Sequence, residues 1–266
     1  MPVSDADLAI AAARAGCDVV RARYGGSLAR FAKSAFDFAT DADFESEHAI
    51  LQVLRAARPG DALEAEESGR TAPEAADDSG DHRTWLVDPL CGTLNYAAST
   101  PLVAVNVALR TDGVVTAAAS ADPFANEVFW TDGHHAYLRR DGSDDRLAPS
   151  AATRLVEVNL DPPYPNRPAF RAVRLLADDG FAEHFRPRVM STGLVLAWVA
   201  AGRRAAYVTD GDLRDSVHFT AGIALCRAAG CVVTGIRGQP LHTGAGGLLA
   251  AADPDTHARL LALVDQ

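Results

Sequence analysis

One turn of this sequence gathers side chains that could do chemistry together, in the segment WLVDPLCGTLNY at residues 85 to 96. Asp88 ends an apolar run, and Cys91 stands among Asp, Pro, Gly and Thr residues, which form turns more often than cores. We expect a helix to begin at Gly92 and Thr93 with free backbone amides. Amides in that position attract anions, so the turn predicts a phosphate site.

Pairs of acidic residues accompany this turn. Asp41 and Asp43 lie near the start of a predicted helix, Glu66 and Glu67 follow an apolar strand, and Asp88 ends another strand. Carboxylates that converge with a backbone carbonyl are the ligands of Mg²⁺, which keeps several waters and also binds substrate phosphate. The combination predicts phosphate chemistry assisted by a divalent metal.

The composition sets limits on the partners. The 266 residues suffice for one large domain or two packed halves. A net charge of -10 argues against a nucleic-acid partner, although bound cations could neutralise an acidic pocket for a small phosphorylated substrate. No apolar run reaches the roughly 20 residues of a membrane span, and the N-terminus has no signal-peptide pattern. We therefore expect a cytoplasmic protein without a membrane partner.

Hydrophobic periodicity predicts alternating helices and strands. The helices are expected at residues 5–23, 43–57, 168–178, 193–201, 219–230 and 255–264. Strand patterns occur around 61–67, 84–90, 102–139, 154–160, 205–209, 231–235 and 248–252. A change of composition near 145–150 predicts a seam between an N-terminal half, 1–148, and a C-terminal half, 149–266, that complete one cleft together.

Other reactive side chains fit structural roles. Three further cysteines lie in apolar patterns and are expected as small core residues: Cys17, Cys226 and Cys231. Two histidines lie in a DGHH turn and are expected in solvent, and two tryptophans suit packing: His134, His135, Trp130 and Trp198. His242 and His257 have no convergent partner in the sequence.

The segment WLVDPLCGTLNY resembles the central motif of the inositol monophosphatase superfamily, Asp-Pro-(Ile/Leu)-Asp-Gly-Thr-x-Asn-(Phe/Tyr). The segments KSAFDFATDADFESE and EAEES resemble that family's lid, first helix and Gly-Glu-Glu-Ser strand end. Further along, STGLVLAWVAAGRRAAYV and HFTAGIALCRAAGCVVT resemble its substrate-side and Trp-Asp-x-Ala-Ala-Gly helices. The resemblance implies an α/β (α+β) chain folded as a layered α/β/α/β/α sandwich, commonly as a homodimer.

The resemblance also implies roles for single residues. A first metal site would consist of Glu66, Asp88 and the Leu90 carbonyl, with Thr93 and Glu66 orienting the attacking water. The amides of Gly92 and Thr93 would hold the phosphate. Asp43 and Glu67 would support the ligands. Lys33 and Asp37 would lie on the lid. Ser191 and Thr192 would form a polar pair that faces the substrate.

Two metal ligands of that family are replaced in this chain. Cys91 stands where the motif has its second aspartate, and His218 stands where the Trp-Asp helix has its own. In that family these two aspartates share one metal, so Cys91 and His218 should lie within contact distance. Asp215 could substitute only if the helix entry shifts. The family's sugar-binding glutamate falls near Thr209 or Asp210, in a longer segment, which argues against an inositol substrate.

A thiol beside an imidazole leaves three functions open. In the first, the enzyme hydrolyses a small phosphate monoester at the retained Mg²⁺ site, while Cys91 and His218, with Asp88, hold Zn²⁺, Fe²⁺ or no metal. In the second, Cys91 is a nucleophile and His218 its base, on an acyl or thioester substrate of specialised metabolism, without metal. Asp215, Asp88 or another acid would then orient the histidine. In the third, the chain is a non-catalytic descendant.

Overall fold

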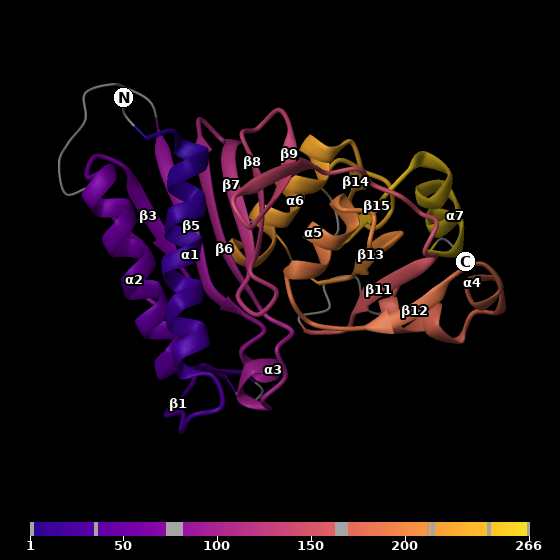
Figure 1. Ribbon diagram of the computed structural model, residues 1–266. Helices are drawn as coiled ribbons and strands as arrows, with labels where there is room; N and C mark the ends of the chain where they lie inside the picture. Colours follow the sequence, from indigo (N-terminus) through magenta and orange to yellow (C-terminus); the bar gives the residue numbers. More distant parts are fainter. Residues whose placement is uncertain are drawn as a thin grey trace.

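The computed structural model describes residues 3–34, 37–72, 82–162, 170–211, 213, 216–243 and 246–264. Within these residues two large β-sheets alternate with three layers of helices, and a two-stranded hairpin forms a third, small sheet (Figure 1). The outer layers contain α1 (Asp5–Arg23) with α2 (Asp41–Ala57), and α4 (Asp179–His184) with α7 (Pro254–Val264). The middle layer contains α5 (Leu194–Ala200) and α6 (Val217–Ala229). The expected α/β/α/β/α sandwich is therefore confirmed.

Local capping fixes where the first two helices begin. The Ser4 side chain accepts a hydrogen bond from the Asp7 amide at the start of α1. At the start of α2, Asp43 accepts hydrogen bonds from the amide and hydroxyl of Thr40, which forms a capping box. Both helices bury apolar stripes against each other and against the first sheet, where Ile50 and Trp85 are fully buried.

The first sheet has the strand order β10-β9-β8-β7-β6-β5-β3-β4. Its neighbours pair antiparallel except β3 with β5, which are parallel. The strands are β3 (Ala62–Ala65), β4 (Gly69–Thr71), β5 (Arg83–Cys91), β6 (Ala104–Thr111), β7 (Val114–Asp122), β8 (Glu127–Thr131), β9 (Ala136–Arg140) and β10 (Ser143–Arg146). Because β3 and β5 are parallel, their carboxyl ends bring Glu66 and Asp88 to the same edge.

The second sheet has the strand order β12-β11-β13-β15-β14. Its strands are β11 (Leu155–Asn159), β12 (Arg186–Val189), β13 (Ala206–Thr209), β14 (Val232–Thr234) and β15 (Leu248–Ala251). One face packs against α5 and α6, and the other packs against α4, α7 and a 3₁₀ helix at Ala172–Ala177. Helices α5 and α6 therefore lie between the two sheets (Figure 1).

Most of the expected elements are confirmed, but the helix expected at 168–178 is wrong. The structure has a 3₁₀ helix at Ala172–Ala177, and residues 168 and 169 lie outside the described ranges. Asp178 then caps a new helix, α4, by accepting a hydrogen bond from the Phe181 amide. This cap interrupts the apolar periodicity, and the strand β12 that follows has no alternating pattern of its own.

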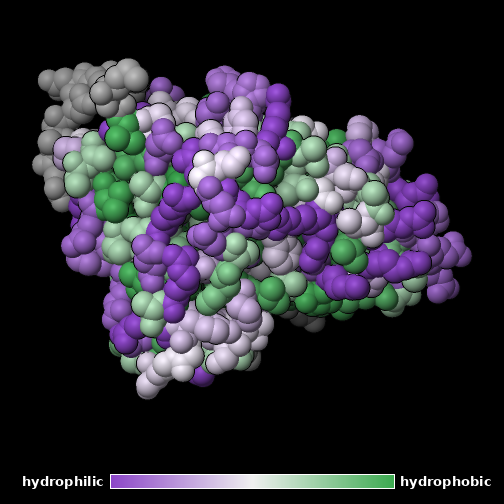
Figure 2. Space-filling view, in the orientation of Figure 1, coloured by the Kyte–Doolittle hydropathy of each residue, from purple (hydrophilic) through white to green (hydrophobic). Residues whose placement is uncertain are grey.

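The surface carries few large hydrophobic side chains in any one place. Figure 2 shows hydrophilic side chains over much of one face, with hydrophobic side chains in separate groups between them. Exposed members of this class include Phe31 and Phe44, whose rings pack edge to face, and Leu94 at the cleft described below. In the described part of the chain, no helix combines the length and apolarity needed to cross a bilayer.

Candidate active site

A bulge in β5 turns Asp88 and Cys91 toward the same side of the sheet. Asp88 lies opposite Asn106 and Cys91 lies opposite Ala104, with a shift of register between them. Pro89 has no N–H to donate to the neighbouring strand, so a bulge is tolerated there. Between these pairs β5 advances by three residues and β6 by two, so β5 contains one extra residue. Side chains three residues apart in a regular strand point to opposite faces, and the extra residue brings Asp88 and Cys91 back to the same face.

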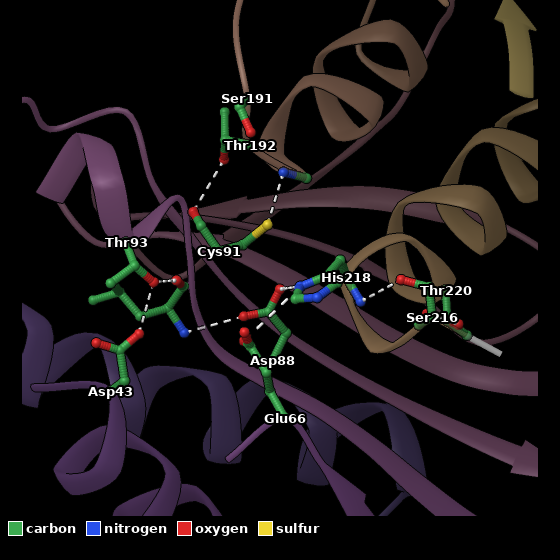
Figure 3. A network of polar contacts seen from close by, with 12 residues as sticks. Asp43, Glu66, Asp88, Cys91, Thr93, Ser191, Thr192, Ser216, His218 and Thr220 are labelled. Carbon is green, nitrogen blue, oxygen red and sulfur yellow. Dashed lines mark hydrogen bonds and ion pairs between the residues drawn. The ribbon is translucent and has the colours of Figure 1, made fainter. Parts of the chain in front are cut away.

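The turn after β5 requires glycine and then positions a hydroxyl. Gly92 has a φ of 105°, and a Cβ there would lie 3.0 Å from the carbonyl oxygen of Leu102. The short helix α3 (Thr93–Ala97) begins at the next residue. The Thr93 hydroxyl lies 2.8 Å from Asp43 Oδ1 and 3.1 Å from the Leu90 carbonyl oxygen (Figure 3). Because its proton is donated to these acceptors, its lone pairs stay free for a third group.

His218 comes from the opposite side, on the first turn of α6. The Ser216 hydroxyl caps this helix by accepting a hydrogen bond from the His218 amide. The imidazole Nδ1 lies 2.8 Å from Asp88 Oδ2 and 3.9 Å from Glu66 Oε2 (Figure 3). Glu66 Oε2 is buried and has no hydrogen-bond partner among the described residues. Asp88 thus holds the imidazole by a hydrogen bond, while Glu66 presents beside it an oxygen without a hydrogen-bond partner among the described residues.

Cys91 lies within reach of both groups. Taking one ligand atom each from Asp88, Cys91 and His218, all three atoms lie within 4.8 Å of one another. The Gly193 amide donates a hydrogen bond to Cys91 Sγ at 3.0 Å. A Cβ on Gly193 would lie 2.7 Å from the His218 carbonyl oxygen and 3.2 Å from Cys91 Sγ, so only glycine brings this amide so close. The predicted contact between Cys91 and His218 is therefore confirmed.

The charges of these groups depend on one another. Burial alone would raise the pKa of Asp88, but the facing His218 lowers it below its ordinary value. Burial opposes the charged form of His218 too, yet Asp88 raises its pKa well above the ordinary value. Burial and then Asp88 raise the pKa of Glu66 to about 8 and that of Cys91 to about 12. Without metal, the site therefore holds an aspartate–imidazolium pair beside a protonated thiol.

Lys33 links the proposed lid to the acidic residues. The hairpin of β1 (Arg30–Ala32) and β2 (Phe38–Thr40) places Lys33 Nζ 2.7 Å from Glu66 Oε1 and 2.6 Å from Glu67 Oε1. Burial opposes the charge of Lys33, but the two glutamates raise its pKa above the ordinary value. At the hairpin's turn, the Asp37 carbonyl accepts the Lys33 amide at 2.9 Å. The ammonium of Lys33 thus forms ion pairs with both carboxylates.

These groups line a cleft of about 600 Å³ between the first sheet and the second. Most of the residues singled out by sequence line it: Asp37, Glu66, Leu90, Cys91, Gly92, Thr93, Ser191, Thr192 and His218. On the far wall, the Ser191 hydroxyl donates to the Asp161 carboxylate, and the Thr192 hydroxyl lies 3.3 Å from the Cys91 carbonyl oxygen. Asp43, Asp88 and Lys33 contact the lining residues Thr93, His218 and Glu66, in that order. Glu67 contacts Lys33, and Asp215 lies outside the described residues.

The sequence missed four groups around the cleft. The Gly193 amide binds Cys91, and Asn159 and Asp161 contribute to the far wall. Asn106 is 1% exposed, and its side-chain nitrogen would lie 3.1 Å from a Cβ on Gly193. The glycine of the STG segment could have indicated a close approach of the backbone, whereas nothing near Asn106 in the sequence indicates its position. Among the residues expected in structural roles, Cys17 and Cys226 are buried, and Cys231 is half-buried rather than in the core.

Known proteins resemble this chain over nearly its whole length. The model of the inositol monophosphatase family matches residues 3–266. The inositol-1-monophosphatase of Caulobacter vibrioides is 32% identical over 234 residues, covering 86% of this chain and 88% of that protein. The Nus factor SuhB of Escherichia coli is 31% identical over 267 residues, covering 98% of this chain and 96% of that protein.

Solved structures agree with the sequence relatives. The extragenic suppressor protein suhB of Bartonella henselae superimposes with a TM-score of 0.82 at 25% identity, covering 98% of both chains. An inositol monophosphatase from Thermotoga maritima has a TM-score of 0.79 at 21% identity, covering 97% of this chain and 96% of that one, and it supports the fold alone. Because the family model covers nearly the whole chain and these two sequence relatives are more than 30% identical over most of it, this chain belongs to the inositol monophosphatase family, whose members are metal-dependent phosphomonoesterases.

Proposed function

We propose that this chain hydrolyses a small phosphate monoester with a divalent cation, Mg²⁺, bound by Glu66, Asp88 and the Leu90 carbonyl. One observation carries the proposal: the Asp43–Thr93 hydrogen bond of 2.8 Å stands next to these oxygen ligands at the floor of the cleft. A thiol mechanism has no use for a threonine held in this way. Its retention beside the carboxylates therefore favours attack by water on phosphorus.

The residues present at the first position fit a hard cation. All three donors are oxygens, and Glu66 Oε2 is a buried oxygen without a hydrogen-bond partner among the described residues. Oxygen ligands and retained waters are what Mg²⁺ prefers. When bound there, the cation supplies charge neutralisation for the phosphate and a more acidic water. Lys33 must then withdraw from Glu66, because its ammonium lies 2.7 Å from Oε1.

The chain's own residues hold the water and the phosphate. Thr93 donates its proton to Asp43, so its oxygen accepts a hydrogen bond from the attacking water, and Glu66 receives the proton that this water loses. As the bond from water to phosphorus forms, the P–O bond to the alcohol breaks, and the departing alkoxide takes up a proton from solvent. The amides of Gly92 and Thr93 point the partial positive charge of α3 toward the phosphate oxygens. Ser191 and Thr192 on the far wall contact the alcohol part of the substrate.

The substrate remains a small phosphate monoester in this proposal. Several relatives, among them those of Caulobacter vibrioides, Mycolicibacterium smegmatis and Mesorhizobium japonicum, have names that specify inositol-1-monophosphatase activity. In this chain, however, the segment where that family's sugar-binding glutamate belongs carries Thr209, which lines the cleft, and Asp210, which is 1% exposed. Asp210 does not line the cleft and forms an ion pair with Arg171, so we do not assign an inositol substrate. The expected homodimer and cytoplasmic location stay predictions.

A second function has one observation in its favour. His218 contacts both Asp88 and Cys91, and the Gly193 amide points at the sulfur, which is the order of an acid–base–nucleophile series. Two features oppose it. Burial and Asp88 raise the pKa of Cys91 to about 12, and Cys91 is only 8% exposed. A protonated, buried thiol is a poor nucleophile.

The test is phosphate release from a panel of small phosphate esters with Mg²⁺ or Mn²⁺. Wild type, Cys91→Ser and Thr93→Ala are compared after each has been shown to fold by circular dichroism. We expect metal-dependent release by wild type, activity within about tenfold in Cys91→Ser, and loss in Thr93→Ala. If Cys91→Ser alone abolishes turnover of an acyl thioester while chelators have no effect, the thiol function replaces the proposed one.

If wild type releases no phosphate and cleaves no thioester under any of these conditions, both catalytic proposals are wrong. The chain would then be a non-catalytic family member. The double variant Cys91→Asp/His218→Asp supplies a positive control, because it restores the family's ligands on this scaffold. Phosphatase activity in that variant alone would show that the two replacements removed the family's chemistry.

A further inference from the structure

We propose that Asp88, Cys91 and His218 form a second metal site, built for Zn²⁺ or a similar thiophilic divalent cation and not for Mg²⁺. The inference deepens the proposed function, because this cation would share Asp88 with the Mg²⁺ of the first site. It rests on the positions of three side chains, and its test is a binding measurement that does not need catalysis.

Three ligand atoms already lie close to a metal-binding arrangement. They lie within 4.8 Å of one another, and the imidazole Nδ1 is 2.8 Å from Asp88 Oδ2. Tetrahedral Zn²⁺ with bonds of about 2.0–2.3 Å holds its ligand atoms roughly 3.3–3.8 Å apart. Replacing the shared proton by a cation therefore requires the nitrogen and oxygen to separate by about half an ångström. Side-chain rotation alone can supply a movement of this size.

The donor set does not fit the cation that the family uses. Mg²⁺ demands near-octahedral oxygen ligands, whereas this position offers one carboxylate, one thiol and one imidazole. Thiolate and imidazole are preferred ligands of Zn²⁺ and other transition metals. The chain thus keeps a hard-ligand site at Glu66, Asp88 and Leu90 and places a soft-ligand site directly beside it.

Neighbouring groups suit a bound thiolate. The Gly193 amide donates to Cys91 Sγ at 3.0 Å, and such a hydrogen bond favours a negatively charged sulfur. Coordination to a divalent cation deprotonates a thiol that would otherwise stay protonated. Asp88 comes from β5 and His218 from α6, so the cation would join two elements that no covalent link holds together.

A fourth ligand of the proposed cation would come from the side where the Glu66 carboxylate and the cleft lie. Glu66 Oε2, the buried oxygen without a hydrogen-bond partner among the described residues, lies 3.9 Å from His218 Nδ1. Cys91 and His218 also line the cleft in which the substrate would bind. Three protein ligands plus one open position is the pattern of catalytic Zn²⁺ sites. The open position would accept a phosphate oxygen of the substrate or water.

The experiment titrates the chelator-treated full chain with Co²⁺, which serves as a spectroscopic substitute for Zn²⁺. We expect a thiolate-to-Co²⁺ charge-transfer band in the near ultraviolet that Zn²⁺ removes and an excess of Mg²⁺ leaves in place. Cys91→Ser should lose the band and bind Zn²⁺ at least about 100-fold more weakly. Cys231→Ser is the matched control, because that half-buried cysteine does not line the cleft, and it should keep the band.

A band that persists in Cys91→Ser, or that Mg²⁺ removes, would overturn the proposal. His218→Asn provides a second variant and should weaken Co²⁺ binding in a chain that retains the thiol. Circular dichroism of both variants separates loss of the site from loss of the fold. The phosphate-release assay on the same samples distinguishes the two proposals: a Co²⁺ band without phosphatase activity defeats only the proposed function, and activity without a band defeats only this inference.

Discussion

Two residues set this chain apart at the scale of single side chains. In the resemblance to the family motif, Cys91 and His218 occupy the positions of two aspartates, so this part of the cleft has lost two carboxylate ligands. The carboxylates that remain, Glu66 and Asp88, lie within 4 Å of the imidazole. A histidine that can carry a positive charge has therefore replaced an acid at a position meant for a cation. In the proposed second site, the cation would have to displace the proton of the imidazole.

Removing the Thr93 hydroxyl should abolish most of the phosphatase activity. Thr93→Ala leaves Asp43 without the donor that lies 2.8 Å away and deprives the attacking water of its acceptor. We expect kcat to fall by about 10²–10³-fold, the size seen when one positioned hydrogen bond is lost from an active site. Thr93→Ser keeps the hydroxyl and should recover most of the rate. Equal kcat values for Thr93→Ala and wild type would remove Thr93 from the mechanism.

The four thiols should differ sharply in their reactivity in the metal-free protein. Burial raises the pKa of Cys17 to about 12, and burial with Asp88 raises that of Cys91 to about 12. A pKa raised so far above the ordinary value leaves almost no thiolate at pH 8. We expect N-ethylmaleimide to label the half-buried Cys231 first, as followed by peptide mass spectrometry. Rapid labelling of Cys91 would instead support the thiol enzyme.

At the scale of elements, local signals were enough to predict most helices, strands and the turn after β5. Residues 5–23 and 255–264 form α1 and α7 to within one residue, because apolar spacing and polar ends agree there. The interrupted helix near 178 was missed, since a side-chain cap on Asp178 overrides the pattern. The sequence motifs also placed Cys91 near His218. They could not show the Gly193 amide at Cys91, which depends on how closely α5 and α6 pack.

Gly193 should tolerate no side chain. In Gly193→Ala, the new Cβ would lie 2.7 Å from the His218 carbonyl oxygen, a backbone atom that cannot rotate away. We expect the free energy of unfolding to fall by about 1–3 kcal/mol from overpacking. Gly180→Ala, where the nearest atoms are side-chain atoms at 3.2 and 3.4 Å, is the matched control and should be close to neutral. Urea unfolding of both variants checks this, and equal stability would mean that α5 can move.

The hairpin of β1 and β2 should compete with the first metal. Lys33 lies within 2.7 Å of Glu66 and Glu67, so its charge must leave before a cation binds the same carboxylates. Lys33→Met should tighten Mg²⁺ binding about fivefold, as expected when about 1 kcal/mol of a partly exposed ion pair is removed. Lys33→Arg keeps the charge and should behave like wild type in calorimetric titrations. Unchanged affinity in Lys33→Met would show that Lys33 does not occupy the metal's place.

At the scale of the whole molecule, the cleft lies between the two large sheets, beside the helices of the middle layer. The first sheet supplies Asp88 and Cys91, and α6 supplies His218 from the layer between the sheets (Figure 1). The last strand of the first sheet ends at Arg146 and the second sheet begins at Leu155. The division into halves at residue 148 stays a prediction, because nothing yet separates their folding. A metal bound between these layers offers a way to measure how far they depend on each other.

Zn²⁺ should therefore stabilise the whole chain and not only the cleft. A ligand that binds only the folded protein contributes about 2.7 kcal/mol at 100 times its Kd. For a chain of this size we expect Tm to rise by about 5 °C, and a chelator should reverse the rise. Cys91→Ala/His218→Ala should show no shift with Zn²⁺, whereas Cys231→Ser should respond like wild type. An equal shift in the double variant, measured by differential scanning calorimetry, would place the stabilising Zn²⁺ elsewhere and separate the cleft from the stability of the fold.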